Sequence, residues 1–71
     1  MKYYIKDKLT ERLQLNCVET TRSYCIHYIM QRYNCSKEYA IITIEDLERC
    51  LHDYDRDAEL HIAQGKIIIS K

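Results

Sequence analysis

The first residues of the chain combine a short strand pattern with a helical repeat. Lys2–Ile5 contains two tyrosines and an isoleucine, which favour a short strand. Ile5, Leu9 and Leu13 then recur every four residues and would share one face of a helix. Asp7 suits the N-cap of that helix, which we expect to end near residues 15–16.

A second helix is predicted from an N-cap at Asn16 to a left-handed C-cap at Asn34. Glu19 follows Asn16 by three residues, as in a capping box. Because its apolar stripe is wide, this helix must pack against two neighbours or face a partner chain. The stripe comprises Cys17, Val18, Thr21, Tyr24, Cys25, Tyr28, Ile29 and Tyr33.

The next segment has mixed preferences. We interpret Cys35–Glu38 as a connection and Tyr39–Ile44 as a short extended segment, because β-branched and aromatic residues favour strands. Thr43, with Asp46 three residues later, resembles a helix start. The predicted helix runs to Tyr54, and its buried face would carry Ile44, Leu47, Leu51 and Tyr54.

The C-terminal residues predict a β-hairpin. Leu60 and Ile62 alternate with polar residues, as in a half-buried strand. Gln64 and Gly65 would form a two-residue turn in which glycine adopts positive φ. Lys66–Ser70 would return as the second strand.

In that returning strand, Ile67 and Ile69 would face the core, and Ile68 would lie on the opposite face of an edge strand open to pairing. The predicted fold is therefore α+β, with three helices and a C-terminal hairpin. Its order, β-α-α-α-β-β, is similar to that of a winged-helix domain, a fold-level analogy only.

Length and composition limit the chain to one small domain, residues 1–71. It contains no proline and one glycine, which predicts mostly regular structure with short connections. A core this small gains from dimerisation, so we expect a homodimer. No signal-type segment and no apolar run of about 20 residues is present, so we expect a cytoplasmic protein that does not enter membranes.

Charge suggests a binding role. The formal net charge is zero, but bases outnumber acids before residue 40 and acids outnumber bases after it. Our leading hypothesis is a small non-enzymatic regulatory or inhibitory protein, of the kind encoded by phages or mobile elements, that binds a protein and has no small-molecule substrate. The residues predicted to contact that protein are Tyr24, Tyr28, Glu45, Glu48 and Ile68.

The alternative is a winged-helix DNA-binding regulator that reads DNA with the helix Ile44–Tyr54. Two features disfavour it. The predicted connection, Asn34–Thr43, exceeds the usual three to four residues, and the reading helix is acidic, with Arg49 as its one base. The bases that would contact nucleic acid are Lys6, Lys8, Arg12, Arg22, Arg32, Arg49 and Lys66.

The sequence predicts no cofactor, metal or catalytic group. One glycine cannot form a phosphate-binding glycine-rich loop. The aspartates at 53, 55 and 57 lack the glycine and the final glutamate of a calcium loop. The four cysteines do not have zinc-ligand spacing, and we expect buried or inert thiols at Cys17, Cys25, Cys35 and Cys50.

Overall fold

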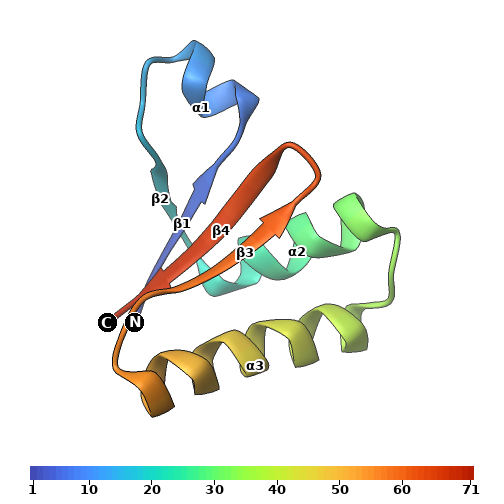
Figure 1. Cartoon of the computed structure of the whole chain (residues 1–71). Coiled ribbons are helices and arrows are strands. Elements are labelled where there is room, and N and C mark those ends of the chain that lie inside the picture. The colour runs from blue at the N-terminus through green and yellow to red at the C-terminus, as the bar shows by residue number, and fades with distance from the viewer.

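The first and last strands of the chain form the centre of one four-stranded antiparallel sheet in the computed structural model, which describes all 71 residues (Figure 1). The strand order is β2-β1-β4-β3. The strands are β1 (Lys2–Lys6), β2 (Val18–Thr20), β3 (Ala58–Ile62) and β4 (Gly65–Ser70), and the helices are α1 (Lys8–Arg12), α2 (Arg22–Tyr33) and α3 (Lys37–Tyr54).

The predicted α+β class, the three helices and the order β-α-α-α-β-β are confirmed. One further strand, β2, lies between α1 and α2. The helices α2 and α3 run side by side in opposite directions (Figure 1), joined by residues 34–36. They form an antiparallel αα-hairpin that packs on the sheet.

The sheet has one buried and one open face because successive side chains on a strand alternate. The predicted inward orientation of Ile67 and Ile69 is confirmed, since both are fully buried. Ile5 pairs with Ile67 across β1 and β4 and shares that face. The helices contribute the other side of the core, chiefly Cys25, Ile29, Ala40, Ile44 and Leu51.

The predicted start of the second helix is wrong. Asn16 does not cap it; the cap is Thr21, whose side chain accepts a hydrogen bond from the backbone N–H of Tyr24 at 3.1 Å. The residues before Thr21 instead form β2, with Val18 opposite Ile5. The pairing with β1 satisfies backbone groups and suits β-branched side chains, which outweighs the helical spacing of Val18.

The start of the third helix is also wrong. Ser36 caps α3 by accepting a hydrogen bond from the N–H of Tyr39 at 3.2 Å, so Tyr39–Ile44 is helical rather than extended. Thr43 lies inside the helix, where its hydroxyl donates to the carbonyl oxygen of Tyr39 at 2.9 Å. The predicted left-handed C-cap of the preceding helix is confirmed at Asn34, with φ of 51°.

The predicted edge position of the strand Lys66–Ser70 is wrong, because β4 is hydrogen-bonded on both sides, to β1 and to β3. Ile68 lies on the open sheet face, opposite Tyr4, and is half-buried. The free edges of the sheet belong to β2 and β3.

The hairpin turn is one residue earlier than predicted. Ala63 and Gln64 connect the strands, and Ala63, not Gly65, has positive φ, at 46°. Gly65 is needed for close packing instead. A Cβ there would lie 2.7 Å from the Tyr28 hydroxyl and 2.8 Å from the carbonyl oxygen of Lys6.

Candidate interaction surfaces

An apolar groove lies beside the free edge of β2. It has a volume of about 290 Å³ and is formed by α1, β2 and the first turn of α2. Leu9 is 61% exposed, Tyr24 56% and Val18 39%, although all three are large apolar side chains. Contiguous exposed apolar side chains of this kind are typical of binding surfaces.

Asp7 fixes the wall of this groove that α1 provides. Its Oδ1 accepts hydrogen bonds from the backbone N–H groups of Leu9 at 2.9 Å and Thr10 at 3.1 Å. Its Oδ2 accepts one from the Tyr28 hydroxyl at 3.3 Å and lies 3.7 Å from the Arg32 guanidinium. The carboxylate therefore ties α1 to α2.

Tyr28 belongs to the core, which corrects its predicted role in contacting a partner. It is 6% exposed, and the guanidinium of Arg32 lies 4.7 Å from its ring centroid. Burial is the main cause that raises the pKa of Tyr28, and the carboxylate of Asp7 adds to it. The helical stripe that predicted an interface at this tyrosine marks core packing instead.

The other free edge, on β3, is partly covered. The Tyr33 hydroxyl donates a hydrogen bond to the carbonyl oxygen of His61 at 3.4 Å. A second apolar groove of about 300 Å³ lies beside this edge, lined by Tyr33, Cys35, Tyr39, Thr43 and Leu60. Since Tyr33 occupies an edge carbonyl, β3 is less open to a further strand than β2.

Glu48 is engaged inside the protein. Its carboxylate accepts hydrogen bonds from Arg22, at 3.0 and 3.2 Å, and from the Tyr3 hydroxyl. Burial alone would raise the pKa of Glu48, but these hydrogen bonds outweigh it and the pKa is lowered. Burial, with the hydrogen bond to Glu48, raises the pKa of Tyr3 to about 12. This cluster joins α2, α3 and β1, so Glu48 stabilises the fold.

The outward side of α3 is acidic and carries Glu45 in an exposed position. Asp46 forms an ion pair with Arg49 at 3.2 Å, which engages the one arginine of this helix. Ile42 is 56% exposed on the same helix. This surface therefore presents negative charge beside an exposed isoleucine.

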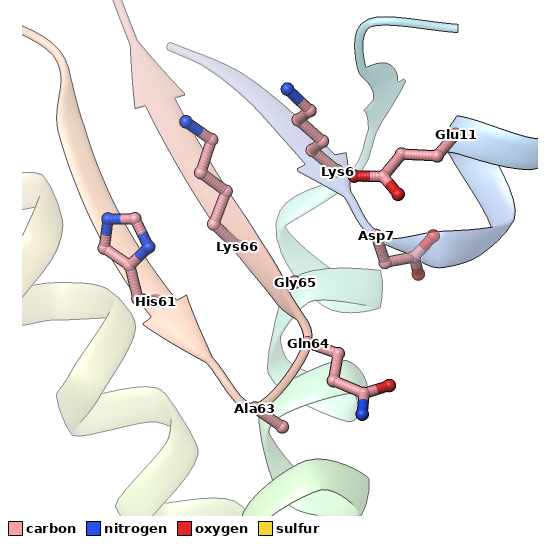
Figure 2. A pocket seen from close by; sticks show the side chains of 8 residues that line it. All are labelled: Lys6, Asp7, Glu11, His61, Ala63, Gln64, Gly65 and Lys66. Atoms are coloured by element: carbon pink, nitrogen blue, oxygen red, sulfur yellow. The ribbon is translucent and has the colours of Figure 1, made fainter. Parts of the chain in front are cut away.

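The open sheet face carries a fourth surface. Figure 2 shows Lys6, Lys66 and His61 extending from three neighbouring strands around a hollow at the β3–β4 turn. The hollow has a volume of about 310 Å³, and Asp7 and Glu11 also line it. Lys66 forms an ion pair with Glu59 at 3.2 Å.

The residues predicted to bind a protein do not form one site. Tyr24 lies at the β2 groove, Glu45 on the outward side of α3, and Ile68 on the open sheet face. The predicted nucleic-acid set is also dispersed. Its members with an acidic partner are Arg22, Arg32, Arg49 and Lys66, and its members without an ion pair are Lys6, Lys8 and Arg12.

Sequence reasoning missed Leu9 and Val18 as groove walls because it placed both on buried helix faces. The β-branched residues Val18 and Thr20, separated by Glu19, carry a weak strand signal that could have indicated an edge. Leu9 is exposed on the short helix α1, which ends at Arg12, a boundary that the spacing of apolar residues did not indicate.

The cysteines are all free thiols, and burial raises the pKa of Cys25 to about 11. No three or more His, Cys, Asp or Glu side chains are grouped so that they could hold a metal ion. None of the helices has the length and apolar character that crossing a membrane requires. No model of a protein family, no curated protein and no solved structure matches this chain.

Proposed function

We propose that this chain is a small non-enzymatic regulatory or inhibitory protein that binds another protein at the free edge of β2. The partner would add an extended segment alongside β2 and insert an apolar side chain into the adjacent groove. The observation that carries this proposal is the unpaired edge of β2 next to an apolar groove walled by Leu9, Val18 and Tyr24.

The physical basis is strand addition. An unpaired edge offers backbone donors and acceptors to an incoming strand, while a pocket beside it selects the side chains of that strand. The strand β2 has three residues, so it can form only a few backbone hydrogen bonds with an incoming strand. The groove must therefore contribute much of the affinity. Covering Leu9 and Tyr24 would remove from water the apolar surface that this chain leaves exposed.

The experiment compares Val18→Lys and Tyr24→Lys with the control Ile42→Lys, which changes an apolar side chain on the outward side of α3 that is as exposed as Tyr24. Affinity capture from an extract of the source cell identifies proteins retained by wild type and by the control. The retained protein is purified and its affinity measured by calorimetry. We expect the two groove variants to bind at least about tenfold more weakly, since losing one buried apolar contact costs about 1.5–3 kcal/mol.

Hydrogen exchange then locates the contact. Successive N–H groups of β2 point alternately to β1 and to the free edge. The amides of β2 that face the free edge should gain protection in the complex, whereas those of β3 should not. A partner that Val18→Lys binds as tightly as wild type, with no protection at these amides, would refute the proposal.

The predicted homodimer is one form of this proposal, because a second copy could pair along the same edge. Glu19 lies at the middle of β2, and two copies paired symmetrically about it would place like charges opposite each other. We therefore favour a different protein as the partner. A molar mass of twice 8.6 kDa by light scattering, reduced to 8.6 kDa by Val18→Lys, would assign the edge to the homodimer.

Reading of duplex DNA by α3 is less well supported. The connection of residues 34–36 has the length of a helix-turn-helix turn, which removes one objection from the sequence. However, α2 and α3 lie antiparallel rather than crossed (Figure 1), and the outward side of α3 is acidic. A gel shift with duplex DNA at low salt tests this alternative. The cytoplasmic location stays a prediction, which microscopy of a fluorescent fusion would test.

A further inference from the structure

The open face of the two central strands carries bases and apolar groups, and the acids of this face, Glu19 and Glu59, belong to the outer strands β2 and β3, opposite Tyr4 and Ile68. From β1 it presents Lys2, Tyr4 and Lys6, and from β4 it presents Lys66, Ile68 and Ser70. The strand register places Tyr4 beside Ile68 in the middle of this stripe and Lys6 beside Lys66 at one end. We call these six residues the central stripe.

Positive charge is concentrated at the end of the central stripe near the β3–β4 turn. Lys6 and Lys66 are opposite each other on adjacent strands. Two like charges in this position repel and destabilise the strand pair. His61 is opposite Lys66 on the other side, and Figure 2 shows all three side chains around the same hollow. Lys66 has one acidic partner, Glu59, and Lys6 has none. An anion bound between the lysines would relieve their repulsion.

Two acids also line the hollow. The carboxylate of Asp7 is already engaged by backbone N–H groups, Tyr28 and Arg32. Glu11 has no ion pair and lies at the rim, where a bound anion would have to avoid it.

We propose that the central stripe binds single-stranded nucleic acid, with one base stacked on the Tyr4 ring beside Ile68. The phosphates on either side of that base would contact Lys2 at one end and the Lys6–Lys66 pair at the other. Lys2 and Lys6 are each two residues from Tyr4 on the same strand, which places them about 7 Å from it along the strand. Stacking on an aromatic ring together with a line of bases is the general mode of single-strand binding.

The formal net charge of zero does not oppose this placement. The acids of α3 lie on the helical layer, and the central stripe faces away from that layer. Glu19 and Glu59 flank the stripe on the open face, so a bound strand would have to run along β1 and β4 between them. The open sheet face also favours a single strand over a duplex. Base readout in duplex DNA requires an element that enters a groove, and the β3–β4 turn has two residues only.

The test uses the full chain and fluorescent homopolymers of thymidine (DNA) and uridine (RNA), each about ten nucleotides long, with a duplex of the same length for comparison. Fluorescence anisotropy measures affinity. We expect tighter binding of single strands than of the duplex. Three phosphate contacts predict that binding weakens about 20-fold when salt rises from about 50 to about 200 mM. The two homopolymers distinguish RNA from DNA.

Two variants and two controls locate the site. Tyr4→Leu should weaken binding about tenfold or more, whereas Tyr54→Leu, on the exposed end of α3, should not. Lys6→Gln should weaken binding and lower the salt slope by about 0.7, whereas Lys37→Gln should not. Circular dichroism checks that each variant folds. If Tyr4→Leu does not fold, amide shift changes in NMR spectra of the wild type replace it, and they should map to the central stripe.

Several results would overturn the proposal. These are absence of binding at low salt, equal affinity for single strands and duplex, no effect of Tyr4→Leu in a folded variant, and amide shifts away from the central stripe. Displacement of the oligonucleotide by polyglutamate at equal charge would indicate a general site for acidic polymers and would also overturn it. Val18→Lys should leave this binding unchanged, so the outcome is independent of the β2 edge.

Discussion

Replacing Gly65 with alanine tests how closely β4 approaches the rest of the fold. The added Cβ would lie 2.7 Å from the Tyr28 hydroxyl, 2.8 Å from the Lys6 carbonyl oxygen and 3.0 Å from the Asp7 Cβ. Separations below 3.0 Å require movement. The hydroxyl is the end of a side chain and can shift, but the Lys6 carbonyl belongs to β1, which is paired with β4 at that point. We therefore expect the substitution to lower the free energy of unfolding in two ways, by displacing the Tyr28 side chain and by shifting the backbone of β1.

Overpacking of this kind costs about 1–3 kcal/mol. At about 4–8 °C per kcal/mol for a domain of this size, Gly65→Ala should lower Tm by between about 4 and 24 °C. Urea unfolding followed by far-UV circular dichroism measures the free energy of unfolding directly. Because the backbone at Gly65 does not have positive φ, strain of the left-handed region cannot explain a loss.

A double-mutant cycle with Tyr28→Phe separates the two contacts. Tyr28→Phe alone should cost about 1–2 kcal/mol, because a hydrogen bond to the Asp7 carboxylate is lost. In the double variant the hydroxyl no longer opposes the new methyl group, so the total loss should be about 0.5–2 kcal/mol smaller than the sum. A Gly65→Ala loss below about 0.5 kcal/mol would refute the packing argument. Strict additivity would assign the whole cost to the contacts with the Lys6 carbonyl oxygen and the Asp7 Cβ.

Three further measurements test other parts of the fold. Ala63→Gly should raise the free energy of unfolding by about 0.5–1 kcal/mol in urea titrations, since glycine accepts the positive φ at this turn, and a loss would contradict the turn geometry. Glu48→Gln should make the free energy of unfolding depend less on pH at acidic pH. The folded pKa of Glu48 lies below its ordinary value of 4.5, so its interaction with Arg22 stabilises the protein above that pH and is lost as pH falls further; parallel wild-type and variant profiles would contradict this. Thr21→Ala should cost about 1 kcal/mol through loss of the α2 cap, whereas Asn16→Ala should be nearly neutral in the same titrations, and the reverse order would contradict the helix start.

Local signals that act within a few residues were predictable from the sequence. The left-handed cap at Asn34 and the inward positions of Ile67 and Ile69 depend on residue type and on alternation. The start of α2 was not predictable from the sequence, because Val18 continues the 3.6-residue spacing of that helix while its β-branched side chain suits a strand. Only the presence of β1 as a pairing partner decides between them, and that partner is distant in sequence.

The candidate surfaces were less predictable than the fold for the same reason. Tyr24 and Tyr28 occupy equivalent places in the apolar pattern, yet Tyr24 lines an open groove and Tyr28 is covered by the fold. The difference depends on where α1 and Gly65 lie. Likewise, the identity of the strand next to β4 decides whether Ile68 sits on an edge, and the sequence does not encode strand order in any local pattern.

The adjacency of β1 and β4 constrains how the chain acquires its structure during synthesis. Residues 2–6 are synthesised before the rest of this domain, but their central partner, residues 65–70, is synthesised after it. Before then β1 can pair with β2 alone, and Ile5 lacks its neighbour Ile67. The sheet therefore closes after translation of residue 70, and the nascent chain exposes its core until that moment. Chaperone contact and proteolysis should fall sharply once residues 65–70 emerge.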